Sequence, residues 1–432
     1  MSDSSLSSIM AMLDGLVDWE RRDRSAMSVD TKPARDLLER LGNPQTRFRA
    51  VHVTGTKGKG SVCALVDAGL RRAGLATGRY ASPHVEQINE RIALNGQQIG
   101  DGPLAWCLSR ALAARQEAIV DGTAGHKASW FDVWTAAAFL SFAEHHVDWA
   151  VVECGVGGLR DSTNVLDADV AVLTNVDLEH TSILGSTCEA IAREKLGILS
   201  AGKPLVTCVS RYAPLGGFVS DVARSRGGYV VYVETLVGEP LQSQNARLAD
   251  AVLAQLHLPP LDKWTIDSTH LPGRQEVVYV PTQAGNSATI PVVLDGAHVP
   301  SSLSALLYDL ERSPRLRGPC AAVIGLGADK DMQGMVRALM NRVVTVLATA
   351  NQHGAPAHDP LDLACAARRC GLQAVEIHDP LNAVREAISE VQTREGDGWV
   401  LVTGSLHLIG VVRPYLRELC RSHAAAYEEL AN

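Results

Sequence analysis

Short apolar runs alternate along the chain with longer segments whose apolar residues recur every three or four positions. Runs of the first kind cover residues 49–55, 148–155 and 169–176, and segments of the second kind cover residues 61–74 and 130–146. A run that is apolar at successive positions predicts a strand buried on both faces, whereas the longer spacing predicts a helix. Such strands, separated by helices, are typical of a parallel sheet covered on both sides. The pattern therefore predicts an α/β fold.

The alternation of expected strands and helices stops after about residue 260. Residues 270–298 are instead rich in glycine, proline and strand-forming residues. The alternation then resumes, with helices expected at 303–312, 335–342 and 360–371 and strands expected at 320–327, 343–350 and 399–405. We therefore predict a second, smaller α/β domain. The expected domains cover residues 1–270 and 271–432, with the break between about residues 258 and 272.

The composition describes an ordinary globular protein. Hydrophobic residues make up 46% and charged residues 20% of the 432 residues. The formal net charge is -8 and no basic block stands out, which argues against nucleic acid as a partner. This charge does not exclude an anionic small substrate, because such a substrate needs only local positive charge.

Neither a membrane partner nor a signal peptide is expected. No apolar stretch approaches transmembrane length, and the N-terminus has an early acidic residue and only a short apolar run. The nine cysteines contain no C-x-x-C pair, so they give no sign of a zinc ribbon or a disulfide framework. Small, reduced core thiols fit the cytoplasm, where we expect the protein to work as a monomer.

Residues 55–61, Gly-Thr-Lys-Gly-Lys-Gly-Ser, lie between the first expected strand and the helix that follows it. Phosphate-binding loops direct backbone N–H groups and a helix N-terminus toward an anion, and a lysine adds a mobile positive charge. The spacing differs from the common G-x-x-x-x-G-K-S/T, because Gly55 stands three residues before Gly58 and Gly60 separates Lys59 from Ser61. The strand–loop–helix context nonetheless favours a phosphate loop over a glycine-rich turn with exposed lysines.

Three further polar residues follow the expected buried strands. Glu153 ends the run at 148–155, where ligands bind in open α/β sheets, although a glutamate at a strand end can also simply face solvent. His180 follows the next strand, and Lys195 lies in a helix after it. A lone histidine is more often structural and a lone lysine more often solvated, so their roles stay open here. A free ammonium could not ligate Mg²⁺, whereas a lysine carbamate could.

Taken together, these motifs resemble those of the folylpolyglutamate synthase/dihydrofolate synthase family of the Mur ligase superfamily, from about residue 13 to residue 410. The family loop reads G-T-N-G-K-G-S, so Lys57 stands where asparagine is usual. The segment VVECGVGGLRDSTNV is similar to the family's E-x-G-x-G-G-R-x-D-x-T-N. Further matches in chain order are GRYASPHVEQINERI, LEHTSILG, IAREKLGIL, LQSQNARLA, LPGRQE, LDGAHVP, ADKDMQGM and VLVTGSLHLIG.

The resemblance implies the Mur ligase architecture, with an N-terminal P-loop-type parallel-sheet ATPase domain and a smaller C-terminal Rossmann-like α/β domain. It also implies an ATP-dependent, ADP-forming amide ligase. The enzyme would add L-glutamate to the carboxylate of folates, of dihydropteroate, or of both through an acyl phosphate. ATP and two Mg²⁺ ions are the implied cofactors, and the site is expected between the two domains.

The resemblance further assigns expected roles to individual residues. Those expected to be catalytic are Lys59, Glu153, His180 and Lys195. The expected Mg²⁺ ligands are Ser82, Glu153, His180 and Lys195, the last as a carbamate. The expected nucleotide-binding residues are Gly55, Thr56, Lys57, Gly58, Lys59, Gly60, Ser61, Asn245, Arg274 and Asp295. Contact with the incoming amino acid is expected from His298 and Ser405.

The chain departs from the family pattern at three positions. Val299 replaces the asparagine of H-N-P, Arg160 is shifted by one position, and Ile88 stands where an aromatic residue is common. These departures leave open a paralogue with the same chemistry on another carboxylate or amine. Two other classes are a nucleotide-hydrolysing switch and a non-catalytic binding protein. The site residues of the second domain disfavour the switch, and the intact Lys59 and Glu153 disfavour the binding protein.

Overall fold

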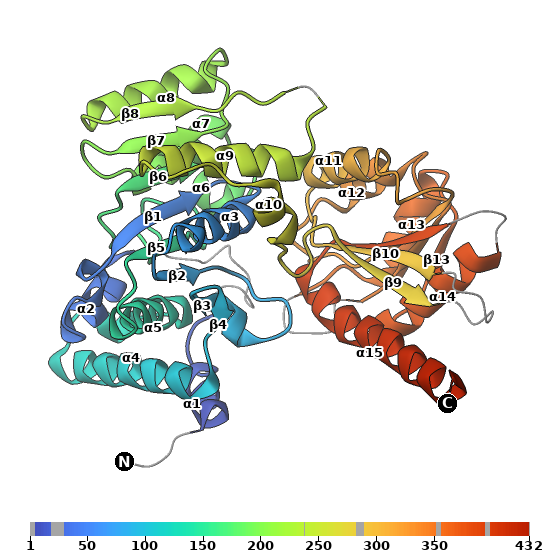
Figure 1. Cartoon of the computed structure of the whole chain (residues 1–432), viewed down its shortest axis with the longest axis horizontal. Coiled ribbons are helices and arrows are strands. Elements are labelled where there is room, and N and C mark those ends of the chain that lie inside the picture. Colours follow the sequence, from blue (N-terminus) through green and yellow to red (C-terminus); the bar gives the residue numbers. More distant parts are fainter. Residues whose placement is uncertain are drawn as a thin grey trace. The chain divides into compact units, whose positions relative to one another are not determined.

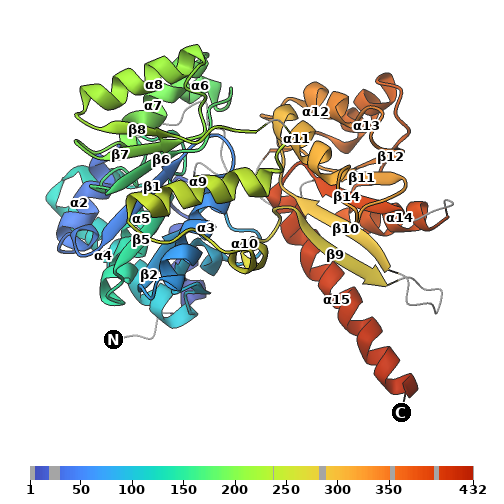
Figure 2. The same ribbon diagram turned by 45° about the horizontal axis from the view of Figure 1, so that its top comes forward.

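The structure is a computed structural model that describes residues 5–18, 30–236, 238–281, 289–350, 356–393 and 398–431. The chain divides into two compact units, Met1–Thr269 and His270–Asn432 (Figure 1, Figure 2). Each unit has its own sheet with helices packed against it, which confirms the predicted α/β class.

An eight-stranded sheet forms the centre of the first unit, in the order β4-β3-β2-β5-β1-β6-β7-β8. Its strands are β1 (Arg49–Thr54), β2 (Thr77–Tyr80), β3 (Ile92–Leu94), β4 (Gln97–Gln98), β5 (Trp149–Glu153), β6 (Val170–Leu173), β7 (Pro204–Thr207) and β8 (Tyr229–Tyr232). Six neighbouring strands run parallel, as predicted: β2, β5, β1, β6, β7 and β8. Strands β3 and β4 add antiparallel pairs at one edge, which the apolar pattern did not predict.

Helices cover both faces of this sheet. They are α1 (Leu6–Leu13), α2 (Lys32–Arg40), α3 (Lys59–Arg72), α4 (Asp101–Asp121), α5 (Trp130–Glu144), α6 (Thr181–Leu184), α7 (Cys188–Lys195), α8 (Pro214–Ser225), α9 (Leu241–Gln255) and α10 (Lys263–Ser268). Ala50 and Val152 pack in one core with residues of α4 and α5, whereas Val51 and Val151 pack in another with residues of α3 and α9. Successive strand residues thus face different cores, which explains why the strands read as continuous apolar runs.

A six-stranded sheet forms the second unit, in the order β13-β12-β11-β14-β10-β9. Its strands are β9 (Glu276–Pro281), β10 (Thr289–Asp295), β11 (Cys320–Ile324), β12 (Thr345–Ala348), β13 (Ala374–Glu376) and β14 (Trp399–Thr403). Its helices are α11 (Pro300–Leu310), α12 (Met332–Leu339), α13 (Pro360–Arg369), α14 (Pro380–Thr393) and α15 (Leu406–Ala431). Only the edge strand β9 runs antiparallel to its neighbour among the strands described.

The second sheet is also buried on both faces. Val293, Ala322 and Leu401 pack in a core with residues of α11, α12 and α13, while α14 contacts β11 and α15 contacts β9. The carboxyl ends of β10 and β14 lie side by side, with Asp295 opposite Thr403. Among the helices described, none is both long enough and apolar enough to span a membrane.

Candidate active site at the phosphate loop

The glycine-rich loop joins the carboxyl end of β1 to the first turn of α3. Gly55 and Gly58 have positive φ angles of 144° and 79°. A Cβ atom on Gly55 would collide with the Thr174 side chain, and a Cβ atom on Gly58 would lie 2.7 Å from Asn245 Oδ1. Glycine is therefore required at both positions by backbone conformation and by space. The structure also places Asn245, from α9, directly against the loop.

Lys59 is the first residue of α3, and its side chain turns back over the loop. Its Nζ donates to the carbonyl oxygens of Gly55 at 3.0 Å and Thr56 at 3.4 Å. The first N–H groups of a helix have no partners within the helix and carry the positive end of its dipole. The loop, the helix N-terminus and the Lys59 ammonium group thus combine the features of an anion-binding site.

Glu153 ends β5 beside the strand that leads into the loop, at the position opposite Val53 of β1. Its side chain is nearly buried, and its Oε2 accepts a hydrogen bond from the Ser82 backbone N–H at 3.3 Å. The structure therefore brings Ser82 and Glu153 together at the carboxyl end of the sheet. Their hydroxyl and carboxylate oxygens are ligands of the kind that Mg²⁺ prefers.

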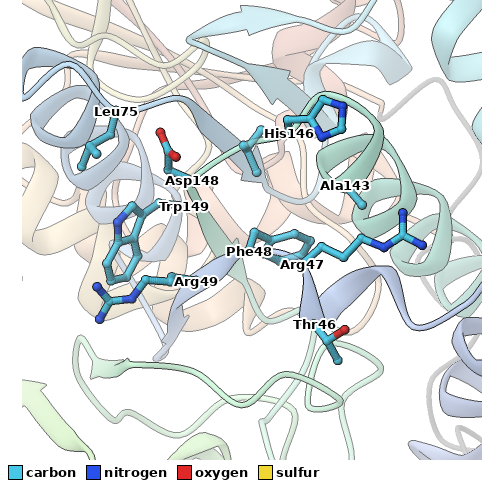
Figure 3. A pocket seen from close by; sticks show the side chains of 10 residues that line it. Thr46, Arg47, Phe48, Arg49, Leu75, Ala143, His146, Asp148 and Trp149 are labelled. Atoms are coloured by element: carbon cyan, nitrogen blue, oxygen red, sulfur yellow. The ribbon is translucent and has the colours of Figure 1, made fainter.

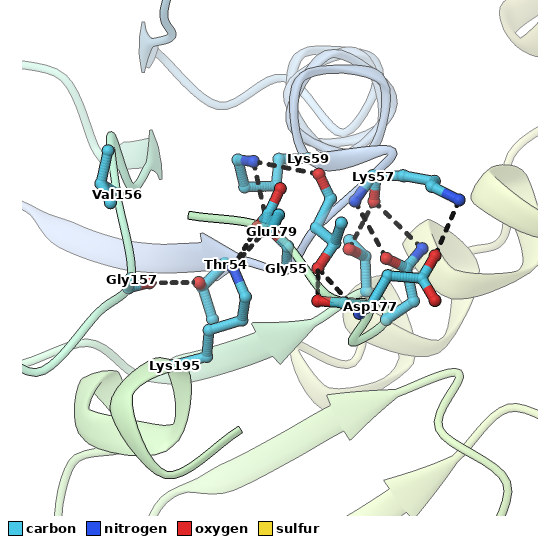
Figure 4. Close-up of polar contacts among 12 residues, drawn as sticks. Thr54, Gly55, Lys57, Lys59, Val156, Gly157, Asp177, Glu179 and Lys195 are labelled. Atoms are coloured by element: carbon cyan, nitrogen blue, oxygen red, sulfur yellow. Dashed lines mark hydrogen bonds and ion pairs between the residues drawn. The ribbon is translucent and has the colours of Figure 1, made fainter. Parts of the chain in front are cut away.

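A nearly buried ion pair between Lys195 and Glu179 lies beside the loop (Figure 4). Lys195 Nζ donates to Glu179 Oε1 at 2.8 Å and to the Gly55 carbonyl oxygen at 2.9 Å. Burial lowers the pKa of Lys195, and Glu179 partly opposes that effect. Burial alone would raise the pKa of Glu179, but the positive charges of Lys59, Lys195 and His180 outweigh it and lower that pKa. One carboxylate therefore faces three basic side chains beside the loop.

Glu179 was not singled out from the sequence. It directly precedes His180, which has a left-handed backbone conformation with φ 45° at the start of α6. The available signal was a carboxylate and a histidine in succession, shortly after the buried strand β6. Adjacent polar residues between two elements look like an ordinary surface turn, and only the fold shows that this turn faces Lys59 and Lys195.

The glycine segment that follows β5 holds the end of α7 close to the loop. Thr54 Oγ1 donates to the Gly157 carbonyl oxygen at 2.6 Å. A Cβ atom on Gly158 would lie 2.6 Å from the Lys195 carbonyl oxygen, so this approach requires glycine. Asp161 is buried and accepts backbone N–H groups of the same segment at 2.9 and 3.0 Å. These contacts fix the backbone from which the Lys195 side chain reaches the loop.

The other expected site residues lie in the second unit, after β10 and β14 and in the turn before β9. Asp295 accepts hydrogen bonds from the backbone N–H groups of residues 275 and 297, both at 2.9 Å. Burial raises the pKa of Asp295, and the nearby charge of Arg274 opposes that effect. His298 Nδ1 lies 2.9 Å from the carbonyl oxygen of residue 296, and Ser405 Oγ accepts the backbone N–H of residue 407 at 3.1 Å. Within the second unit, these residues gather at the carboxyl ends of adjacent strands.

A separate hollow of about 630 Å³ lies at the opposite, amino end of β1 and β5 (Figure 3). Its lining residues are Thr46, Arg47, Phe48, Arg49, Leu75, Ala143, His146, Val147, Asp148 and Trp149. The guanidinium group of Arg49 lies 3.0 Å from Asp169 and 4.2 Å from the centre of the Trp149 ring. Arg47 lies 3.9 Å from Glu144. The hollow therefore lies away from the carboxyl ends of β1 and β5, where the loop and Glu153 meet.

The donors beside the loop fit Mg²⁺ better than a metal held entirely by protein. Among the residues that the structure describes, no three His, Cys, Asp or Glu side chains are grouped as metal ligands. Ser82 and Glu153 offer oxygen atoms, and Glu179 and His180 lie near Lys59 and Lys195. Mg²⁺ usually keeps several waters and binds through one or two carboxylates together with substrate phosphates. A mixed and incomplete set of protein ligands is therefore compatible with such an ion.

Comparison with known sequences gives consistent matches. The family described as Mur ligase, glutamate ligase domain, matches residues 273–406. The chain is 31% identical over 430 residues to folylpolyglutamate synthase of Lacticaseibacillus casei, with 91% of this chain and 96% of that protein covered. It is 32% identical over 419 residues to the probable bifunctional folylpolyglutamate synthase/dihydropteroate synthase of Haloferax volcanii, with 89% of this chain covered. The chain spans 48% of that longer protein.

Solved structures match the fold over nearly the whole chain. Mycobacterium tuberculosis folylpolyglutamate synthase complexed with ADP has a TM-score of 0.83 at 27% identity, covering 96% of this chain and 98% of that one. A bifunctional folylpolyglutamate synthase/dihydrofolate synthase with Mn, AMPPNP and L-glutamate bound has a TM-score of 0.79 at 27% identity, with the same coverage.

Proposed function

Because the chain belongs to the folylpolyglutamate synthase/dihydrofolate synthase family, we propose that it is an ATP-dependent, ADP-forming amide ligase. It adds L-glutamate to the carboxylate of a folate, of dihydropteroate, or of both. The observation that carries this proposal is the meeting of three features at the carboxyl ends of β1, β5 and β6. These features are the phosphate loop, the Glu153 carboxylate and the buried Lys195–Glu179 pair. The bound ADP, AMPPNP and L-glutamate of the related structures support the same substrates here.

The reaction needs an activated carboxylate, because a free carboxylate is a poor electrophile. An oxygen of the acceptor carboxylate attacks the γ-phosphorus of ATP, which gives an acyl phosphate and releases ADP. The amine of glutamate then attacks the acyl carbon, loses a proton, and phosphate leaves. Lys59 and the N–H groups at the start of α3 stabilise the negative charge that spreads over the phosphoryl oxygens.

Divalent metal binding is the second part of the proposal. Ser82 and Glu153 would hold one Mg²⁺, and Glu153, His180 and the carbamate of Lys195 would hold a second. These ions supply positive charge that neutralises the phosphate oxygens. The closeness of Ser82 to Glu153 supports the first ligand set. His180 and Lys195 both lie near Glu179, which supports two of the three members of the second set.

Lys195 ligates Mg²⁺ only if its amine has added carbon dioxide, and we propose that carbamate. Carbon dioxide adds to a neutral amine, and the burial that lowers the pKa of Lys195 favours that form. The resulting anion would lie close to the Glu179 carboxylate, so the carbamate should form only together with a cation. Nuclear magnetic resonance with isotope-labelled bicarbonate tests this, because a carbamate signal should require Mg²⁺ and should vanish in Lys195→Met.

In the second unit, we propose that Arg274 and Asp295 bind nucleotide and that His298 and Ser405 contact the incoming amino acid. Their gathering at the carboxyl ends of β10 and β14 supports this assignment, since ligands bind at such strand ends in open α/β sheets. His298→Ala should then raise the KM for glutamate more than the KM for ATP, and Arg274→Ala should do the reverse.

The function is tested by phosphate release from ATP with Mg²⁺ and either dihydropteroate or a tetrahydrofolate, with and without glutamate. Mass spectrometry then identifies the products. The proposal expects release only when acceptor and glutamate are both present, with a product heavier by one glutamate residue. The matched control is Lys59→Met, which removes the ammonium group and keeps most of the side-chain length. If neither dihydropteroate nor a tetrahydrofolate gave coupled phosphate release, the folate assignment would be rejected. That result would favour a paralogue acting on another carboxylate or amine.

A further inference from the structure

The segment between β6 and α6 is bound along its length to the phosphate loop. Strand β6 ends at Leu173 and α6 begins at Thr181, so residues 174–180 have no helix or strand of their own to hold them. The Thr56 N–H donates to the Asn175 carbonyl oxygen at 3.1 Å, and the Lys57 N–H donates to Asn175 Oδ1 at 2.9 Å. The position of this segment therefore depends on its contacts with the loop.

The same contacts continue toward the end of the segment. Thr56 Oγ1 accepts the backbone N–H of Asp177 at 3.0 Å. Beyond it, Lys57 Nζ lies 2.7 Å from Asp177 Oδ2, and Figure 4 shows this ion pair on the side of the loop away from Lys59. Thr56 Oγ1 also donates to the Asp177 carbonyl oxygen at 3.4 Å, so the loop holds both the backbone and the side chain of Asp177 shortly before Glu179 and His180. A displacement of Asp177 would move these two residues directly, because only one residue separates it from Glu179.

The exposure of the pair decides how strong the effect can be. The Lys57 side chain is 25% exposed and the Asp177 side chain 46% exposed. Ion pairs exposed to this degree contribute about two- to fivefold to an equilibrium, because water screens the charges. The pair is therefore too weak to hold the unit together, but strong enough to bias the position of a short irregular segment.

We propose that Lys57 and Asp177 form a positioning pair that holds Glu179 and His180 in register with the phosphate loop. Lys57 acts through Asp177 rather than by binding phosphate itself. Asparagine, the usual residue at position 57 in the family that the sequence resembles, has no charge with which to form this pair. The pair is thus a feature of this chain, and its effect on activity rests on the proposed function.

The test uses Lys57→Met, Asp177→Asn and the double variant, with Lys57→Arg as the conservative change. Kinetics would be measured at varied Mg²⁺ and at varied ATP. Each single variant should raise the Mg²⁺ concentration for half-maximal rate about two- to fivefold, with a much smaller change in the KM for ATP. The double variant should be no worse than either single variant, because both remove the same interaction. Lys57→Arg should retain the wild-type Mg²⁺ dependence.

The opposite pattern would overturn the proposal. If Lys57→Met raised the KM for ATP while Asp177→Asn left all kinetics unchanged, Lys57 would be a phosphate-binding residue instead. Asp267→Asn serves as the matched control, since the pair of Asp267 with Lys263 at 2.8 Å is exposed and lies on α10. This control should change neither constant.

A second measurement is independent of the ligase activity. Amide hydrogen exchange of residues 174–180 should become faster in Lys57→Met and in Asp177→Asn than in wild type, and should not change in Asp267→Asn. If the wild-type protein lacked ligase activity, the proposed function would fail. Amide hydrogen exchange would still test whether Lys57 and Asp177 hold residues 174–180 in position. Unchanged exchange in both variants would reject the positioning pair whatever the activity.

Discussion

Among the residues that the structure describes, Glu179 is the carboxylate that pairs with Lys195, and replacing it by glutamine removes that partner. The Lys195 side chain is 2% exposed and that of Glu179 is 11% exposed, so both groups lie largely out of water. In the variant, the ammonium group of Lys195 keeps the Gly55 carbonyl oxygen at 2.9 Å as a partner. The glutamine side chain can still accept a hydrogen bond, but it brings no charge. The variant therefore leaves a buried cation without its counter-charge.

Two arguments give the size of the loss. Breaking a buried ion pair by removing one partner destabilises a protein by about 3–5 kcal/mol. The alternative is that Lys195 gives up its proton, and neutralising a lysine with an ordinary pKa at pH 7 costs about 5 kcal/mol. Burial already lowers the pKa of Lys195, so neutralising it costs less than that of an ordinary lysine. We therefore expect Glu179→Gln to lower the free energy of unfolding by about 3–4 kcal/mol.

Urea unfolding followed by tryptophan fluorescence measures this loss in the first unit. Six of the seven tryptophans precede residue 270, Trp399 being the exception, so the signal reports mainly on that unit. Asp267→Asn is the matched control, because it breaks a pair of equal length, 2.8 Å, whose lysine is 89% exposed. That control should cost less than about 1 kcal/mol.

The pH dependence has a definite sign. A lysine whose pKa is lowered in the folded state holds fewer protons there than in the unfolded chain, so stability rises with pH between the two pKa values. Removing Glu179 lowers the pKa of Lys195 further, so the deficit of the variant should shrink as the pH is raised above 7. A deficit independent of pH would point to lost packing rather than to the charge.

The double variant Glu179→Gln, Lys195→Met separates the two explanations. It removes the buried cation together with its partner, and it should recover much of the stability lost in Glu179→Gln. A single variant no less stable than Asp267→Asn would refute the reasoning. So would a double variant less stable than the single variant, because the penalty would then not come from an uncompensated charge.

Three further predictions concern other residues of the first unit. Burial lowers the pKa of His52 to about 3, so only the unfolded chain binds a proton there in mild acid. Urea unfolding should show about 2–3 kcal/mol less stability at pH 4.5 than at pH 7 from this group, a slope that His52→Gln should flatten. Gly58→Ala should cost about 1–2 kcal/mol by the same assay, because alanine must adopt a left-handed conformation and its Cβ meets Asn245. It should also raise the KM for ATP. Lys59→Met should lower kcat in the phosphate-release assay by about 10²–10³, with the unfolding midpoint changed far less.

The parts of the site that the sequence predicted follow buried strands. Apolar runs locate β1 and β5, and parallel strands place their carboxyl ends at one edge of a sheet. The loop after Thr54 and the carboxylate of Glu153 are therefore brought together by the strand pattern itself. Glycine-rich segments added a second signal, because each marks a close approach of backbone to another group.

The site residues that the sequence did not predict lie in an irregular segment, and their roles depend on how that segment packs against the phosphate loop. Asp177 and Glu179 lie in a stretch without periodicity, so nothing in the pattern distinguishes them from solvent-exposed acids. Their partners Lys57 and Lys195 are far away in sequence, and an ion pair between distant residues leaves no mark on local hydrophobicity. The antiparallel strands β3 and β4 were missed because they are only three and two residues long, too short to show a pattern.

The distribution of charge around the loop explains how an acidic chain can offer an anion site. The net charge of -8 belongs to the whole molecule, whereas Lys57, Lys59 and Lys195 all contact or belong to the loop or its flanking segment. Two of these lysines have a carboxylate within 3 Å, Asp177 or Glu179, so their positive charge is balanced when no anion is bound. Such balancing limits the repulsion between neighbouring lysines, which would otherwise destabilise the loop. It also means that acidic residues beside a phosphate loop are not evidence against anion binding, because Lys59 and the backbone N–H groups at the start of α3 still offer positive charge to the phosphates.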